Sequence, residues 1–251
     1  PANPAPVPPQ ARDPRRSGTP VPRQPATGAA TPTPEPVAQS VTLPGTDILS
    51  SPWLGPTLGT VRERWFYSPE LDRDMPYYIY LPPDYGTAER RYPVLYMLHG
   101  LGGHREEWIV YDLLNIADRE IARGNIPPMI IVLPQGDKGY WTNHTADGPL
   151  WGEYLSRDLV AMIDATYRTL RSPDARAIGG LSMGGWGALH HAFTRPDLFG
   201  IVGAHSASLR VDDGSLDFLG TGAEFASKSP LELAGTAKGI ENLRIWIDSG
   251  E

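Results

Sequence analysis

The 251-residue sequence contains no cysteine. This absence excludes a thiolate nucleophile, a disulfide framework and a zinc site built on cysteine ligands. Long apolar runs are also missing, because no stretch approaches the roughly 20 residues that a membrane-spanning helix needs. Any chemistry of this chain must therefore use oxygen and nitrogen side chains, and no membrane span is expected.

Large apolar residues are scarce at the start of the chain, where 12 of the 27 prolines lie within the first 39 residues. Residues 1–39 are mainly Pro, Ala, Thr and Arg, so they cannot bury enough surface to offset the entropy of ordering. We interpret 1–39 as a disordered Pro/Thr/Ala-rich tether, 40–58 as an irregular lead-in and 59–251 as a folded domain. Because the chain begins with proline rather than methionine, we expect a trimmed or mature product, and the Pro/Thr-rich tether favours a secreted or cell-envelope protein.

Positive charge is in deficit outside the tether. From Ser40 onward there are 18 basic and 27 acidic residues, a net charge of −9, because the tether holds four arginines and two acids of the totals of 22 and 29. An acidic domain binds polyanions poorly, so we expect no nucleic-acid partner.

Strand and helix patterns alternate from residue 59 onward, which predicts an α/β domain. Residues 92–98 and 129–133 are nearly continuous apolar runs, as expected for parallel strands covered on both faces. Residues 107–123 and 151–170 carry apolar side chains at helical spacing. We predict a doubly wound, mostly parallel sheet with right-handed crossovers.

A glycine-rich turn surrounds Ser182. An apolar run enters the sequence GLSMG at residues 180–184, and a helical pattern follows. This spacing predicts a strand, a strained turn with the serine at its apex, and a helix. Gly180 and Gly184 are expected because the strand and the helix pass too close for side chains. Ser182 is therefore the candidate nucleophile, and the alternative is an ordinary glycine-rich turn.

Two backbone amides are candidate donors to an oxyanion. The Met183 N–H lies at the start of the predicted helix, where unpaired donors favour negative charge. The strand at 92–98 runs into the sequence HGLGG at 99–103, and the Leu101 N–H of that loop is the second candidate.

Three motifs resemble the putative-esterase family of the α/β-hydrolases, which includes S-formylglutathione hydrolases, feruloyl and acetyl-xylan esterases, enterobactin-type esterases and mycolyltransferases. They are YLPPDY at 80–85, LHGLGG at 98–103 and GLSMGG at 180–185. The resemblance implies an α/β-hydrolase fold and a serine esterase that needs no metal or organic cofactor. The substrate, a sugar-linked or other small acyl ester, is suggested by the resemblance only.

The segment 136–151 is rich in aromatic residues and glycine, and it follows a strand at the edge where α/β sheets bind ligands. Its candidate pocket residues are Trp141, Asn143 and His144, and His99 and His205 stand at neighbouring strand ends. The alternative is a loop held by its own aromatic residues without substrate contact, with the histidines in structural roles.

No histidine occupies the place expected of a triad base. In α/β-hydrolases the acid and then the histidine follow the serine. His190 and His191 lie about two turns along the helix after Ser182, roughly 12–14 Å away. His205 precedes the strand whose loop should carry the acid.

The candidate acid is Glu251, and Asp248 inside the preceding strand is interpreted as structural. We expect the chain to lack the last strand, the histidine loop and the closing helix of its domain, and to be poorly active as it stands. Two alternatives to an esterase remain open, namely an acyltransferase that uses a sugar or alcohol acceptor, and a carbohydrate- or ester-binding protein without catalysis.

Overall fold

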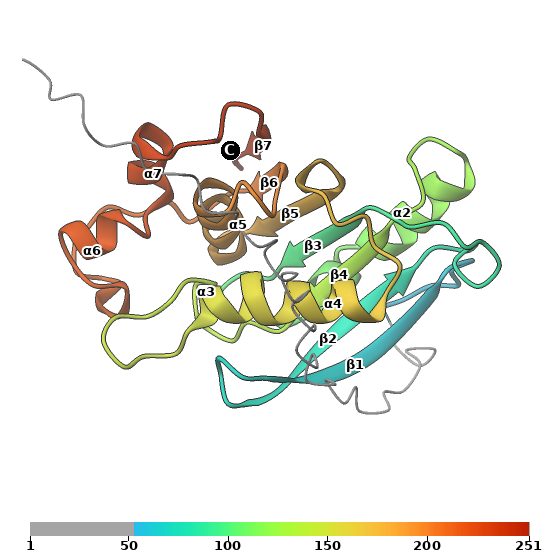
Figure 1. Ribbon diagram of the computed structural model, residues 1–251, viewed down its shortest axis with the longest axis horizontal. Helices are drawn as coiled ribbons and strands as arrows, with labels where there is room; N and C mark the ends of the chain where they lie inside the picture. Colours follow the sequence, from blue (N-terminus) through green and yellow to red (C-terminus); the bar gives the residue numbers. More distant parts are fainter. Residues whose placement is uncertain (1–52, 251) are drawn as a thin grey trace, which may run out of the picture. The chain divides into compact units, whose positions relative to one another are not determined.

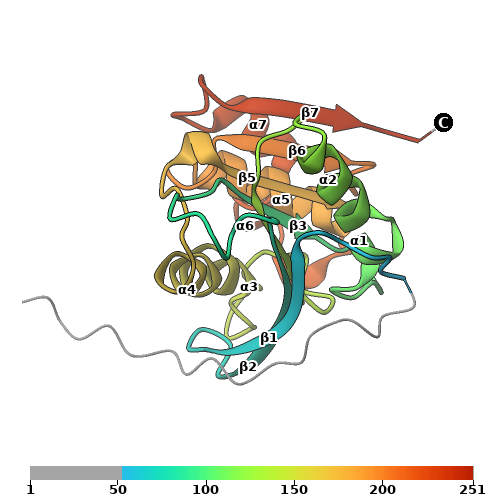
Figure 2. The ribbon, with the colours of Figure 1, turned by 90° about the vertical axis from the view of Figure 1, so that its right-hand side faces the viewer.

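A seven-stranded sheet with helices on both faces forms the folded domain in the computed structural model, which describes residues 53–250. The strand order is β1-β2-β4-β3-β5-β6-β7. Figure 1 shows the sheet running from β1 at the bottom to β7 at the top, and Figure 2 shows α4 and α2 on opposite sides of it. The predicted tether, most of the lead-in and Glu251 lie outside the described residues.

The strands are β1 (Thr60–Ser68), β2 (Arg73–Leu81), β3 (Val94–Leu98), β4 (Ile130–Pro134), β5 (Arg176–Leu181), β6 (Ile201–His205) and β7 (Arg244–Asp248). The α-helices are α1 (Glu107–Val110), α2 (Leu113–Ala122), α3 (Trp151–Glu153), α4 (Val160–Thr166), α5 (Met183–Thr194), α6 (Ala223–Ala226) and α7 (Pro230–Thr236). A π-helix, Tyr154–Leu159, joins α3 to α4, and short 3-10 turns occupy Pro173–Ala175 and Asp217–Leu219.

The sheet is mostly parallel, as predicted. β1 pairs with β2 and β2 with β4 in antiparallel fashion, whereas β4, β3, β5, β6 and β7 are mutually parallel in that spatial order. The carboxyl ends of the parallel strands therefore meet at one edge, where α/β sheets bind ligands.

Strand periodicity sorts the apolar side chains into two layers. In β3, Val94, Tyr96 and Leu98 are buried in the cluster that includes α4 and α5, whereas Leu95 and Met97 pack in the cluster with α1 and α2. Because successive strand residues point to opposite faces, a strand covered on both sides must be apolar throughout. This explains the continuous apolar run on which the strand was predicted.

Two predicted helices are shorter or more divided than their periodicity implied. The segment 107–123 breaks into α1 and α2 because Asp112 adopts a left-handed backbone with φ 63°. The segment 151–170 ends at Thr166, since Tyr167 is extended with φ −118° and ψ 159°. Side-chain spacing reports which face is buried, and it is insensitive to a single residue that leaves the helical region.

A buried carboxylate anchors the start of the domain. Residues 53–59 form no helix or strand before β1. Asp118 on α2 accepts hydrogen bonds from the Leu58 and Gly59 amides at 2.8 and 2.7 Å and from the Tyr80 hydroxyl at 2.9 Å.

Of the helices within residues 53–250, none has the length and apolar character that crossing a membrane requires.

Candidate active site

Ser182 stands between β5 and α5, at the carboxyl edge of the parallel strands. Its backbone has φ 55° and ψ −110°, a region that residues with a Cβ rarely adopt. Its amide donates to the His205 carbonyl at 3.0 Å, and its own carbonyl accepts from the Trp186 and Ser208 amides at 3.0 and 2.9 Å. The strained turn predicted from the sequence is present and is held by hydrogen bonds on both sides.

Close backbone contacts require the two flanking glycines. A Cβ on Gly180 would lie 2.3 Å from the carbonyl carbon of Gly184, and a Cβ on Gly184 would lie 2.2 Å from the Leu98 carbonyl oxygen. Both distances are far inside van der Waals contact. The expected reason for these glycines, that strand and helix pass too close for side chains, is confirmed.

The two candidate oxyanion donors come from adjacent strands. β3 and β5 are neighbours with Leu98 opposite Gly180, so the loop that contains Leu101 and the turn at Ser182 leave the sheet side by side. Met183 is the first residue of the 12-residue helix α5. Within residues 53–250, neither the Leu101 nor the Met183 N–H donates to another protein atom. Both amides are free to bind a ligand oxygen.

The His99 side chain is enclosed within the protein and contacts the 99–103 loop, while its predicted contact with substrate stays a prediction. Its side chain is fully buried, its Nε2 accepts from the Gly136 amide at 2.9 Å, and its Nδ1 lies 2.8 Å from the Gly100 carbonyl. The amide on Nε2 places the ring proton on Nδ1, which therefore donates to Gly100. Burial lowers the pKa of His99, in agreement with a neutral ring.

Trp141 is also fully buried. Its indole N–H donates to the His99 carbonyl at 3.2 Å, and a Cβ on Gly136 or Gly187 would lie 2.4 Å from its side-chain atoms. Its backbone has φ 56°. The structure thus shows that Trp141 packs in the core and forms a hydrogen bond to the 99–103 loop, while its contact with substrate stays a prediction.

We expect Trp141→Ala to destabilise the domain by about 3–5 kcal/mol, because a large buried aromatic side chain is lost and the His99 carbonyl loses its donor. Tyr111→Ala is a suitable control, since Tyr111 is 54% exposed. Chemical denaturation of both variants measures the difference. Equal midpoints would show that the site of Trp141 does not contribute to stability.

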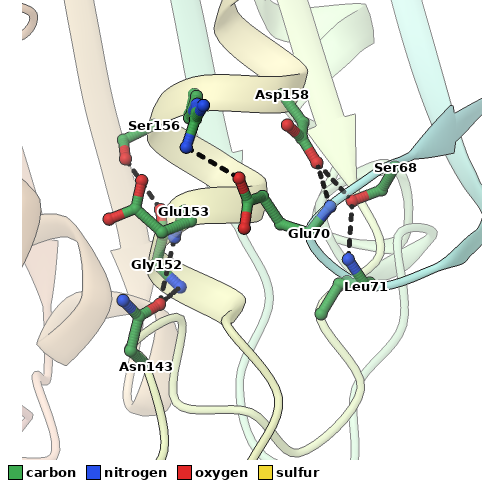
Figure 3. A network of polar contacts seen from close by, with 9 residues as sticks. Ser68, Glu70, Leu71, Asn143, Gly152, Glu153, Ser156 and Asp158 are labelled. Carbon is green, nitrogen blue, oxygen red and sulfur yellow. Dashed lines mark hydrogen bonds and ion pairs between the residues drawn. The ribbon is translucent and has the colours of Figure 1, made fainter.

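Asn143 and His144 have contacts that order the loop between β4 and α3. Asn143 Oδ1 accepts from the Gly152 and Glu153 amides at 2.8 and 3.1 Å, beneath the first turn of α3 (Figure 3). His144 Nε2 lies 3.3 Å from the Gly139 carbonyl, and its ring lies against Phe218 with 4.5 Å between centroids. No contact of either residue tests the predicted role in substrate binding.

His205 forms an ion-pair geometry that the sequence did not predict. Its Nδ1 lies 3.1 Å from Asp248 Oδ2, and its ring packs against Trp108 and Trp246 with centroids 5.4 and 4.7 Å apart. The parallel register of β6 and β7 places His205 directly opposite Asp248. The sequence predicted both strands but not which residues of the two strands lie opposite each other, so this contact was missed.

The two histidines of α5 make their hydrogen bonds to backbone carbonyls away from the turn at Ser182. His190 Nδ1 donates to the Lys228 carbonyl at 2.9 Å, and His191 Nε2 donates to the Trp141 carbonyl at 2.8 Å. Burial lowers the pKa of His190 to about 4 and that of His191 to about 3.

Among residues 53–250, no group of three or more His, Asp or Glu side chains is placed to hold a metal ion.

A protein family described as “Putative esterase” matches residues 68–251. Similar curated proteins include Esterase Rv1288 of Mycobacterium tuberculosis (strain ATCC 25618 / H37Rv), which is 39% identical over 142 residues that cover 54% of this chain and 30% of that protein. An endo-1,4-beta-xylanase/feruloyl esterase of Xylanibacter ruminicola is 32% identical over 157 residues, covering 58% of this chain and 21% of that protein. The chain thus spans less than a third of the length of these relatives.

Solved structures agree with the fold. A ferulic acid esterase is 25% identical with a TM-score of 0.63, over 73% of this chain and 74% of that chain. An S-formylglutathione hydrolase from Agrobacterium tumefaciens is 19% identical with a TM-score of 0.65, over 84% of this chain and 79% of that chain. Together with the strand order, these similarities show an α/β-hydrolase fold.

Proposed function

Because the chain belongs to the “Putative esterase” family, we propose that it hydrolyses a carboxylic ester through an acyl-serine intermediate on Ser182. The observation that carries the proposal is the strained backbone of Ser182, with φ 55° and ψ −110°, directly before the free amide of Met183 at the start of α5. Strain of this kind is retained where it has a use, such as the presentation of a nucleophile.

The arrangement supports a two-step reaction. The Ser182 hydroxyl attacks the ester carbonyl carbon while a base takes its proton, and the resulting oxyanion receives hydrogen bonds from the Leu101 and Met183 amides. The base then returns the proton to the departing alcohol, which leaves an acyl ester on Ser182. Water attacks that ester in the same way, releasing the acid and restoring the hydroxyl.

We infer that none of the six histidines within residues 53–250 is the base. His99, His104 and His144 precede Ser182 in the chain, whereas the triad histidine of the α/β-hydrolases follows the serine. His99, His190 and His191 are held by the backbone contacts described above, and His144 contacts the Gly139 carbonyl. His205 lies on the face of the sheet that carries Trp108 of α1, and the hydrogen bonds among the described residues do not join it to the Ser182 hydroxyl. The proposal therefore places the base outside the described residues.

His205→Gln tests this part of the proposal in the full-length natural protein. Glutamine keeps a polar partner for Asp248 but cannot accept a proton at neutral pH, so kcat for p-nitrophenyl acetate should stay within about threefold of wild type. A loss of about 10³-fold or more would make His205 the base, in an order that differs from the family pattern.

The substrate is proposed from the relatives. The relatives include a feruloyl esterase and an acetyl esterase, which makes a sugar-linked acyl ester the first class to test. Product analysis in the presence of competing sugar and alcohol acceptors distinguishes the two catalytic functions. Free acid as the main product supports the hydrolase, an acyl-sugar or acyl-alcohol supports the transferase, and ester binding without turnover supports the non-catalytic alternative.

A further inference from the structure

Two consecutive peptide groups of the 99–103 loop, the proposed oxyanion loop, have hydrogen-bond partners for nearly all their polar atoms. In the 99–100 peptide, the His99 carbonyl accepts from the Trp141 indole at 3.2 Å, and the Gly100 amide donates to both carboxylate oxygens of Glu107 at 3.2 and 3.1 Å. In the 100–101 peptide, the Gly100 carbonyl accepts from His99 Nδ1 at 2.8 Å and from the Gly103 amide at 3.0 Å. The remaining polar group is the Leu101 N–H.

Peptide planarity converts these contacts into a direction for the free amide. In a trans peptide the N–H points away from the C=O of the same group. Fixing the Gly100 carbonyl therefore fixes the Leu101 N–H. The hydrogen bonds from the Gly100 amide to Glu107 fix the plane of the 99–100 peptide. Gly100 is therefore restrained on both sides, although glycine has the greatest backbone freedom of all residues.

The loop is shaped around the Glu107 carboxylate. A Cβ on Gly103 would lie 1.8 Å from Glu107 Oε2, and a Cβ on Gly100 would lie 3.5 Å from Oε1. Glu107 is held in turn at the first residue of α1, whose next residue, Trp108, donates its indole N–H to the Leu98 carbonyl at 3.0 Å. The carboxylate thus occupies a site that the glycines of the HGLGG sequence leave open for it.

We propose that Glu107 is a positioning residue for the oxyanion hole, which holds the Gly100 amide so that the Leu101 N–H faces the developing negative charge. This inference rests on the proposed function, because it assigns a role to the same site. Donors of this kind act through preorganisation, and loss of one donor lowers kcat by about 10²–10³-fold.

The test compares Glu107→Ala, Glu107→Gln and the neighbouring control Glu106→Ala in the full-length natural protein. Glu106 accepts from the Tyr78 hydroxyl at 3.1 Å and makes no hydrogen bond to the loop within the described residues. We expect Glu107→Ala to lower kcat for p-nitrophenyl acetate by about 10–100-fold with KM within about twofold. Glu107→Gln should recover most of the loss because its amide oxygen still accepts from Gly100, and Glu106→Ala should match wild type.

A second readout does not depend on activity. Hydrogen exchange of the Gly100 amide, followed by NMR, should become about tenfold or more faster in Glu107→Ala and stay near wild type in Glu107→Gln. Absence of Ser182-dependent turnover in wild type would contradict the proposed function and leave this exchange result to decide on Glu107. Unchanged exchange in Glu107→Ala, unchanged kcat in an active protein, or equal damage from Gln and Ala would overturn the proposal.

Discussion

Ser182→Ala is expected to lower kcat for p-nitrophenyl acetate by about 10⁴–10⁶-fold in the full-length natural protein, because removal of a catalytic serine leaves only binding and the oxyanion hole. KM should change little, since the methyl group of alanine fits where the serine Cβ lies. The residual rate should exceed that in water by about 10³–10⁴-fold if the Leu101 and Met183 amides still bind the oxyanion.

Ser208→Ala is the matched control for that experiment. The Ser208 amide donates to the Ser182 carbonyl at 2.9 Å, but its hydroxyl contacts only the Arg210 side chain among the described hydrogen bonds. A normal rate in Ser208→Ala would show that the effect belongs to the Ser182 hydroxyl. Equal rates in Ser182→Ala and wild type would rule out the acyl-serine mechanism.

Gly184→Ala is expected to destabilise the domain by at least about 3 kcal/mol, because its methyl group would lie 2.2 Å from the Leu98 carbonyl oxygen. The clash involves backbone atoms of β3, so no side-chain rotation relieves it. For a domain of this size the melting temperature should fall by roughly 6–12 °C.

Gly86→Ala provides the comparison, since a Cβ at Gly86 would have no atom within 4 Å. Its melting temperature should stay within about 2 °C of wild type, as for most exposed substitutions. Similar melting temperatures for Gly184→Ala and Gly86→Ala would show that β3 and α5 can separate at no cost, and the described packing of the turn at Ser182 against β3 would be wrong.

Local chemistry explains how much of the fold the sequence could predict. The apolar runs at β3 and β4, the GLSMG turn and the 12-residue helix α5 follow from side-chain periodicity and from glycines at fixed offsets. The break at Asp112 could not be predicted in this way, because a single left-handed residue leaves the pattern of buried positions unchanged.

The contacts of the site that join segments distant in the chain could not be predicted from the sequence. The contact of His205 with Asp248 depends on the register of β6 and β7. The hydrogen bond from the Gly100 amide to Glu107 depends on how α1 packs against the 99–103 loop. Trp141 shows the same limit, since an aromatic residue near a sheet edge does not reveal its burial or its hydrogen bond to the His99 carbonyl, and its contact with substrate stays a prediction.

Mass spectrometry of the full-length natural protein after reaction with a fluorophosphonate probe tests the central claim most directly. The account predicts a single adduct on the Ser182 hydroxyl, its absence in Ser182→Ala, and loss of esterase activity in proportion to labelling. An active enzyme that carries no adduct at Ser182, or one whose inhibition follows labelling of another residue, would contradict the claim that Ser182 is the nucleophile.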